Sequence, residues 1–250
     1  FDKKSEKYVV GKNEEEIYRK LGLAYIEPEM RENRGEIEVA SNNKLPNLIK
    51  YNEIKGDLHV HSNWSDGLDS IETIARYCKT IGYEYIGITD HSQSLKVAHG
   101  LSEERIEKKI NEIEKINKKI KNFSILCGTE CDIKTDGTLD YSNRVLKKFD
   151  FVCAGIHSTF KMKSEDNTKR IINAIENENV TFLAHPTCRL MRRRDPLDLD
   201  IEKIFDTAKA TNTYLEINSF PDRLDLKDIH VKQAKEKGVK FVISTDAHTL

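Results

Sequence analysis

Two histidines separated by one residue, His59 and His61, are the first residues of this chain whose spacing suggests chemistry. They lie in the stretch 56–62, which we predict to form a short β-strand that ends by presenting the two histidines. Because side chains alternate across a strand, the two imidazoles would lie on one face about 7 Å apart, close enough for both to bind one metal ion. A lone His-x-His pair is more often two surface or core histidines. The metal interpretation therefore depends on the rest of the chain.

The same event recurs along the chain, because a histidine or an acidic residue directly follows most of the predicted strands. In parallel α/β sheets and barrels, the active site is built from the loops after the carboxyl ends of the strands, so these residues should meet at one rim. Six of the eight histidines fall there, which structural histidines would have no reason to do. The residues are His59, His61 and Asp66 after the first strand, Asp90 and His91 after the second, Glu130 after the third, His157 after the fourth, His185 after the fifth, and Asp246 and His248 after the seventh.

The elements that must position these residues begin near residue 54, where β-branched stretches alternate with helical patterns. This alternation is typical of repeated βα units and a parallel sheet. Ser70 and Ser102 are suited to cap two of the helices, and the isoleucines of the second should face inward while its lysines and glutamates face solvent. The predicted strands are 55–60, 85–89, 124–128, 151–156, 181–184, 214–217 and 241–244, and the predicted helices are 70–81, 102–121, 142–147, 167–177, 201–210 and 226–237.

Composition narrows the class of protein. The chain has 250 residues, of which 38% are hydrophobic and 33% charged, which is typical of one large α/β domain with or without a fragment of another. No apolar run approaches the roughly 20 residues that span a bilayer, so we expect a cytoplasmic protein without membrane contact. The net charge of -1 excludes a generally basic nucleic-acid binder. Five cysteines without a Cys-x-x-Cys pair favour a reducing compartment.

The donor types indicate which metals and which reaction to expect. Imidazole and carboxylate without thiolate suit Zn, Mn or Fe at a catalytic site, whereas structural zinc normally recruits cysteine. Without Asp90 these residues make nine candidate ligands, which are too many for one ion, but a shared carboxylate such as Glu130 would give a cluster of two or three ions. Such clusters activate water and stabilise both oxygens of an in-line displacement at phosphorus. The sequence therefore predicts a metal-dependent phosphoesterase.

The order and spacing of these ligands resemble the polymerase and histidinol phosphatase (PHP) domain over about residues 54–250. That resemblance implies a distorted seven-stranded, TIM-like (βα)7 barrel with a metal cluster at the carboxyl ends of its strands. It also implies two or three divalent ions, Zn or Mn and possibly Fe, and catalytic roles for Asp66, His91, Glu130 and Asp246. The implied sets are His59, His61, Glu130 and Asp246 for one ion, Asp66, His91 and His248 for a second, and Glu130, His157 and His185 for the third.

Within this family the chain is most similar to the carboxyl-terminal domain of bacterial and archaeal family X DNA polymerases. The stretches 14–23 and 25–31 resemble the end of the polymerase thumb, and 34–38 leads into the Gly-Asp-Leu-His-Val-His-Ser start at 56–62. The resemblance implies a thumb remnant and linker at 1–50 and a PHP phosphoesterase domain at 51–250, with the polymerase domain in cis. Because the chain stops two residues after His248, we expect a fragment of a longer protein. Cys188, where glycine is expected, and the stretch 218–221 depart from the family pattern.

Substrate contacts are less determined by the sequence. Four arginines within six positions follow His185, and contact with DNA phosphates is favoured over a solvated face. His99 could contact substrate or have a structural role, and Trp64 could wall the pocket or stack on a base. The candidate substrate-binding residues are therefore Arg189, Arg192, Arg193, Arg194 and His99.

The family X resemblance implies a 3′-to-5′ exonuclease, 3′-phosphatase and AP endonuclease acting on DNA ends or on abasic or gapped DNA in repair. Two alternatives stay open. A small-molecule phosphomonoesterase of the histidinol-phosphatase type is disfavoured by the thumb-like amino terminus. A non-catalytic, metal-stabilised scaffold of a polymerase is disfavoured by the complete set of candidate ligands.

Overall fold

The computed structural model describes residues 11–250, and the chain divides into two compact units, Phe1–Glu53 and Ile54–Leu250. The described part of the first unit contains the helices α1 (Glu14–Lys20) and α2 (Glu36–Ser41) and the 3-10 turns η1 (Pro28–Met30) and η2 (Tyr51–Glu53). Arg31 lies 2.7 Å from a Glu14 oxygen, with its guanidinium 5.5 Å from the ring centroids of both Tyr18 and Tyr25. Polar and cation–π contacts around Arg31 therefore organise this small unit.

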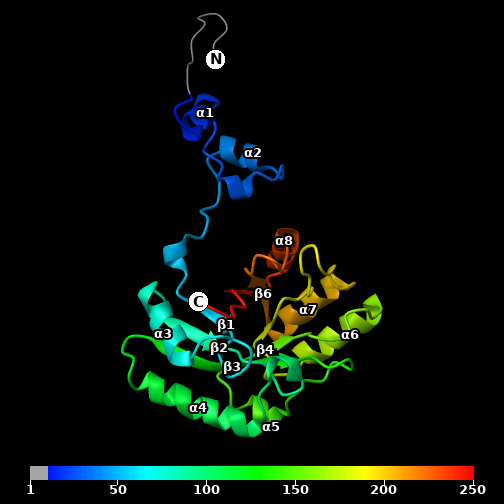
Figure 1. Cartoon of the computed structure of the whole chain (residues 1–250). Coiled ribbons are helices and arrows are strands. Elements are labelled where there is room, and N and C mark those ends of the chain that lie inside the picture. Colours follow the sequence, from blue (N-terminus) through cyan, green and yellow to red (C-terminus); the bar gives the residue numbers. More distant parts are fainter. Residues whose placement is uncertain (1–10) are drawn as a thin grey trace, which may run out of the picture. The chain divides into compact units, whose positions relative to one another are not determined.

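The second unit is built on one seven-stranded sheet in which every neighbouring pair is parallel and the strands follow sequence order (Figure 1). This is the pattern expected of consecutive βα units. The strands are β1 (Gly56–Val60), β2 (Tyr85–Ile88), β3 (Ser124–Asp132), β4 (Phe151–Gly155), β5 (Phe182–Leu183), β6 (Tyr214–Asn218) and β7 (Phe241–Ser244).

Six α-helices of the described residues connect these strands and surround them (Figure 1). Two helix starts agree with the predicted caps, because Ser70 accepts a hydrogen bond from the Thr73 amide at 3.2 Å and Ser102 accepts one from the Arg105 amide at 3.4 Å. The helices are α3 (Ile71–Thr80), α4 (Glu103–Asn117), α5 (Asn143–Leu146), α6 (Ser164–Ile175), α7 (Ile201–Thr211) and α8 (Asp228–Glu236), and a 3-10 turn, η3, covers Lys96–Ala98.

The interior of the sheet is filled by aromatic side chains below the strand ends. Phe151 and Phe182 stack with ring centroids 6.0 Å apart, and His59 lies 6.3 Å from Phe182. A side-chain carbon at Gly87 or Gly128 would come within 2.6 Å of the Phe151 ring, so these glycines leave the space that the ring occupies. The interior is therefore apolar beneath the histidines and excludes water from below them.

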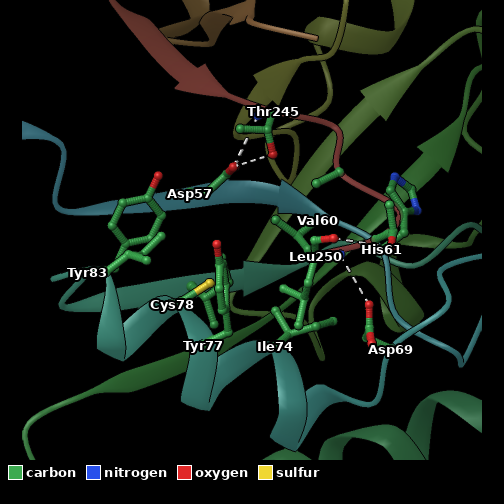
Figure 2. A pocket seen from close by; sticks show the side chains of 14 residues that line it. Asp57, Val60, His61, Asp69, Ile74, Tyr77, Cys78, Tyr83, Thr245 and Leu250 are labelled. Carbon is green, nitrogen blue, oxygen red and sulfur yellow. Dashed lines mark hydrogen bonds between the residues drawn. The ribbon is translucent and has the colours of Figure 1, made fainter. Parts of the chain in front are cut away.

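Contacts between β1 and the residues after β7 nearly close the sheet into a barrel. Val60 forms a parallel bridge with Ala247, and the Asp57 carboxylate accepts hydrogen bonds from the amide and hydroxyl of Thr245 (Figure 2). A cavity of about 170 Å³ lies beside this seam, and the side chains that line it include Val60 of β1, Ile74 and Cys78 of α3, and Leu250 (Figure 2). The predicted seven-stranded barrel is thus confirmed.

None of the helices within residues 11–250 combines the length and the apolar character needed to cross a lipid bilayer. The cytoplasmic location stays a prediction.

Candidate metal centre

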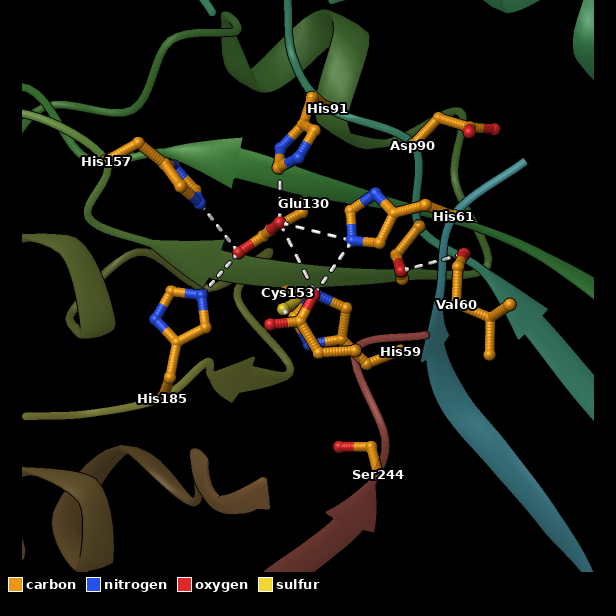
Figure 3. A network of polar contacts seen from close by, with 12 residues as sticks. His59, Val60, His61, Asp90, His91, Glu130, Cys153, His157, His185 and Ser244 are labelled. Atoms are coloured by element: carbon orange, nitrogen blue, oxygen red, sulfur yellow. Dashed lines mark hydrogen bonds and ion pairs between the residues drawn. The ribbon is translucent and has the colours of Figure 1, made fainter. Parts of the chain in front are cut away.

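The strand ends bring the nine predicted ligands to one side of the barrel. The ring centroids of His59 and His61 lie 5.2 Å apart on one face, closer than the predicted separation, while Val60 points away from them (Figure 3). Glu130 lies inside the extended strand β3, and His91 pairs with it through a parallel bridge. Side chains separated by up to 189 positions in sequence therefore face one another.

The carboxylate of Glu130 is at the centre of this group and is only 1% exposed (Figure 3). Its Oε1 lies 2.9 Å from His157 Nε2 and 2.8 Å from His185 Nε2. Its Oε2 lies 3.1 Å from His91 Nδ1 and 3.4 Å from His59 Nε2. His61 Nε2 also lies 3.5 Å from Oε2. Because the two oxygens face different histidines, Glu130 is placed as a carboxylate that could be shared between neighbouring metal positions.

Two aspartates extend the group on either side of His61. Asp246 Oδ1 lies 3.3 Å from His61 Nε2, and Asp66 Oδ1 lies 3.6 Å from His61 Nδ1. Asp66 Oδ2 is 3.5 Å from the Nε2 atoms of both His91 and His248. Three sets have ligand atoms within 4.8 Å of one another: His59, His61, Glu130 and Asp246; His61, Asp66, His91 and His248; and His91, Glu130 and His157.

The first of these sets is the one that the family resemblance implies. The second adds His61 to the implied set, and the third has His91 where His185 was implied, although His185 also contacts Glu130. The distribution of ions among the ligands stays a prediction.

Buried nitrogen atoms without partners test whether these residues fit a metal. His59 Nε2, both ring nitrogens of His61, His91 Nδ1 and His185 Nδ1 are buried and make no hydrogen bond. Buried polar groups are normally paired, because an unpaired one loses its hydration without compensation. Imidazole lone pairs gathered around carboxylates are the donors that Zn and similar ions take. The residues therefore fit a divalent metal cluster.

Carboxylates behind the histidines fix the orientation of two rings. Glu216 Oε1 lies 2.7 Å from His59 Nδ1, and Asp132 Oδ1 lies 3.0 Å from His157 Nδ1. Each contact directs the opposite ring nitrogen toward Glu130, as carboxylates behind metal-bound histidines do. Sequence reasoning missed both acidic residues. The available signal was an acidic side chain inside an otherwise apolar strand.

A buried ion pair supports the loop that carries Asp66. Lys109 Nζ lies 2.8 Å from Asp90 Oδ2, and both side chains are fully buried. Asp90 in turn accepts hydrogen bonds from the Ser62 amide at 2.8 Å and the Ser65 hydroxyl at 2.8 Å. The expectation that the lysines of α4 face solvent is wrong at Lys109. Its buried ammonium group pairs with Asp90 and donates to the backbone carbonyls of Ile88 and Gly128.

Burial and charge set the protonation of the rings. Burial lowers the pKa of His61 to about 4, which leaves the neutral imidazole that a metal requires. Burial also disfavours the charged form of His157, but the negative charges of Glu130 and Asp132 outweigh it and raise its pKa to about 10. Burial and the nearby charge of Arg223 both lower the pKa of His185.

The predicted substrate contacts divide into two groups. Arg189 donates to the carbonyls of Arg223 and Leu224, and Arg194 donates to the Cys188 carbonyl at 2.7 Å with its guanidinium 3.9 Å from the Phe160 ring centroid. These two arginines support the fold. The exposed residues are Arg192, Arg193 and His99, of which Arg193 lies 3.5 Å from Asp222 and His99 belongs to none of the three ligand sets.

Trp64 lies at the edge of the same loop system. Its indole Nε1 donates to Glu112 at 3.0 Å, and the guanidinium of Arg105 lies 5.8 Å from its ring centroid. Arg105 also donates to the carbonyls of Trp64 and His99, so it ties together the loops after β1 and β2. These contacts give Trp64 a structural role beside the site.

Comparison with known proteins identifies the family. Residues 57–220 match the PHP domain, and residues 1–32 match the DNA polymerase beta thumb. The chain belongs to the PHP domain family. This membership confirms the predicted enzyme class, a metal-dependent phosphoesterase, and the thumb match confirms the resemblance to the family X polymerases.

Two relatives show how far the similarity extends. The DNA polymerase/3′-5′ exonuclease PolX of Bacillus subtilis is 47% identical over 238 residues, which are 95% of this chain and 41% of PolX. The chain therefore spans about two fifths of the length of that relative. A Thermoanaerobacter protein assigned as a phosphatase is 32% identical over 204 residues, 77% of this chain and 78% of that protein.

Two solved structures share the fold. A Listeria monocytogenes protein assigned to the histidinol phosphatases superposes with a TM-score of 0.61 at 15% identity, over 78% of this chain and 96% of that one. The histidinol phosphate phosphatase of Lactococcus lactis, solved with zinc, L-histidinol and phosphate, gives a TM-score of 0.57 at 17% identity, over 78% and 86%. At these identities the likeness establishes the PHP barrel alone.

Proposed function

We propose that the unit 54–250 hydrolyses phosphodiester bonds at DNA ends, as the 3′-to-5′ exonuclease domain of a family X polymerase. The observation that carries this proposal is the Glu130-centred cluster, in which buried, unpartnered histidine nitrogens surround shared carboxylates. The 47% identity to PolX supports DNA as the substrate. We further propose residues 1–50 as the thumb remnant and linker, 51–250 as the phosphoesterase domain, and a polymerase domain in cis.

The ligands would hold two or three divalent ions, with Zn and Mn the best matches to imidazole and carboxylate donors. The zinc in the Lactococcus structure supports the first of these. When bound, such ions supply an activated water and neutralise the charge that develops at phosphorus. The chain itself contributes the bridging carboxylate of Glu130, the ring orientation set by Glu216 and Asp132, and a dry floor formed by Phe151 and Phe182.

A phosphomonoesterase is the second candidate function. It is favoured by the 32% identity to the Thermoanaerobacter protein, which the chain matches over most of its length. Both candidate activities would use the same cluster, so they differ in the part of the substrate that extends beyond the reacting phosphate. The thumb match at residues 1–32 favours DNA.

The test compares 3′-labelled duplex DNA, abasic duplex and histidinol phosphate as substrates, each with Mn and with Zn. We expect hydrolysis of the DNA substrates and at least about a 100-fold loss in Asp66→Ala, because this removes a carboxylate that stabilises the reacting centre. Asp66 is partly exposed, so its truncation opens no core cavity.

The matched control is Asp206→Ala, which removes an exposed aspartate of α7 paired with Lys237. It should hydrolyse DNA at the wild-type rate. Turnover of histidinol phosphate without turnover of either DNA would replace the first candidate by the second. A tenth or more of wild-type activity in Asp66→Ala would overturn the metal mechanism.

A further inference from the structure

One arginine that sequence reasoning did not single out, Arg223, reaches the cluster from the loop after β6. Its Nε lies 2.9 Å from Asp246 Oδ2, and its side chain is 15% exposed. Among the described residues, Asp246 is the one hydrogen-bonding or ionic partner of the Arg223 guanidinium. The Nη1 atom of Arg223 is buried and has no hydrogen-bond partner. A guanidinium has five N–H donors, so most of its donor capacity is unused.

Three other cations near the site are held by Asp90 or by backbone carbonyls rather than by a candidate metal ligand. Lys109 has three N–H groups and three acceptors, the Asp90 carboxylate and the carbonyls of Ile88 and Gly128. Arg189 and Arg194 donate to backbone carbonyls, as described above. Arg223 is therefore, among these four, the cation that is paired with a candidate metal ligand, Asp246, and keeps unused N–H donors.

The loop that carries Arg223 is held in place on both sides. The Asp225 carboxylate accepts hydrogen bonds from the amide of Thr187 at 2.9 Å and from its hydroxyl at 2.8 Å. The Met191 amide donates to the Asp222 carbonyl at 2.6 Å, and Arg189 donates to the carbonyl of Arg223 itself. The segment that follows His185 thus fixes the backbone of Arg223, which reduces the entropy that its side chain loses when it binds a ligand.

The two carboxylate oxygens of Asp246 have different neighbours. Oδ1 faces the Nε2 atoms of His59 and His61, whereas Oδ2 lies 2.9 Å from Arg223 Nε and accepts from Asn218 Nδ2 at 3.3 Å. Arg223 therefore does not block the oxygen that faces the histidines. The guanidinium of Arg223 is thus held beside Asp246, a candidate metal ligand, through Nε alone, and its Nη1 has no hydrogen-bond partner.

We propose that Arg223 is the phosphate-binding cation of this site, with its terminal N–H groups donating to a non-bridging oxygen of the substrate phosphate. The inference rests on the proposed phosphoesterase function and names a substrate contact for it. A planar guanidinium matches the geometry of two phosphate oxygens, and hydrogen bonds between ionised groups are shorter and stronger than neutral ones. Arg189 then acts on the reacting phosphate indirectly, because it donates to the backbone carbonyl of Arg223.

The experiment uses the whole chain loaded with Mn or Zn and compares Arg223→Gln, Arg223→Lys and the control Arg76→Gln. Arg76 lies exposed on α3 and pairs with Glu72. Four quantities are measured: bound metal per chain, KM and kcat for a small phosphate ester, and protection against thermal unfolding by inorganic phosphate.

We expect Arg223→Gln to keep the wild-type metal content and to weaken phosphate binding by about 10- to 100-fold, the range for lost hydrogen bonds to a charged group. KM for the ester should rise accordingly. Phosphate affinity in Arg223→Lys should lie between those of wild type and Arg223→Gln, because lysine keeps the positive charge but lacks the paired N–H donors of a guanidinium. Arg76→Gln should match wild type in every quantity.

Unchanged phosphate binding in a folded Arg223→Gln, or in Arg223→Lys if the first variant does not fold, would overturn the proposal. Loss of metal with unchanged phosphate binding would show instead that Arg223 only positions Asp246. The proposed function can fail separately, because a metal-loaded wild type that hydrolyses none of the esters still reports phosphate binding. Absence of phosphate binding by that wild type would also overturn the role of Arg223.

Discussion

At the scale of single residues, the same side-chain type takes different roles according to which of its atoms is left free. His61 has two buried ring nitrogens without partners, while the Nδ1 of His59 is taken by Glu216. His59 therefore offers Nε2 to a metal, whereas His61 can offer either ring nitrogen, one in each tautomer of the neutral imidazole. This explains why His61 belongs to two of the three possible ligand sets.

Glu216 should control metal affinity without touching the metal. Its carboxylate accepts from the Ser244 hydroxyl at 2.5 Å and the His185 amide at 2.5 Å and lies 2.7 Å from His59 Nδ1. In Glu216→Gln an amide group replaces one acceptor oxygen, so we expect metal affinity to fall about 10- to 100-fold. A metal titration followed by activity should show the rate recovering at higher metal concentration.

The exposed variant Glu178→Gln, whose residue pairs with Lys147, serves as the control and should titrate like wild type. If Glu216→Gln bound metal as tightly as wild type, the ring orientation of His59 would have to be fixed by the fold alone.

At the scale of elements, α4 does more than cover the sheet, because Lys109 ties it to the loops after β1 and β2. Lys109→Met should lower the free energy of unfolding by about 3–5 kcal/mol, since it leaves the Asp90 carboxylate buried without its counter-ion. Urea unfolding measures this loss. The double variant Lys109→Met with Asp90→Asn should recover part of it, and strictly additive losses would show that the two side chains do not interact.

The arginine segment after β5 should likewise separate into structural and DNA-contacting residues. Arg192 and Arg193 are exposed, so their joint replacement by Gln should weaken DNA binding and flatten the plot of log affinity against log salt by up to about two units. A small phosphate ester should be turned over normally. Binding measured from 50 to 200 mM salt tests this, with Arg144→Gln on α5 as the control.

Arg194→Gln should behave differently and lower the unfolding free energy by about 1–2 kcal/mol, because it loses the Phe160 ring and the Cys188 carbonyl. For the variant with both Arg192 and Arg193 replaced by Gln, an unchanged salt dependence of DNA binding would assign these two arginines to a solvated face.

These elements also show what the sequence could and could not predict. Strand ends were predictable because apolar stretches with β-branched residues end directly before residues such as Asp90 and His157, and a parallel order brings such ends together. The sequence could not predict the roles of Glu216, Lys109 and Arg223. A single buried charge in a strand, helix or loop has no periodicity that reveals its partner. Glu216 and Arg223 act across strands, on His59 and Asp246, and Lys109 acts on Asp90 from the helix behind the sheet.

At the scale of the whole molecule, the cluster connects both ends of the barrel unit, since His59 and His61 follow β1 while Asp246 and His248 follow β7. Backbone contacts also join these segments, where the His61 amide donates to the Ala247 carbonyl at 2.9 Å and the Leu68 amide to the His248 carbonyl at 2.8 Å. Anything that holds the ligands together should therefore stabilise the closure of the sheet.

Metal removal should thus lower the melting temperature of this unit. An ion that binds only the folded state at 100 times its Kd contributes about 2.7 kcal/mol, or roughly 5–10 °C for a domain of this size. Differential scanning calorimetry before and after chelation measures the shift, and readdition of Mn or Zn should reverse it. His61→Ala should shift less on chelation than wild type, because His61 belongs to two ligand sets. Equal melting temperatures with and without bound metal would mean that the fold alone holds the ligands in place.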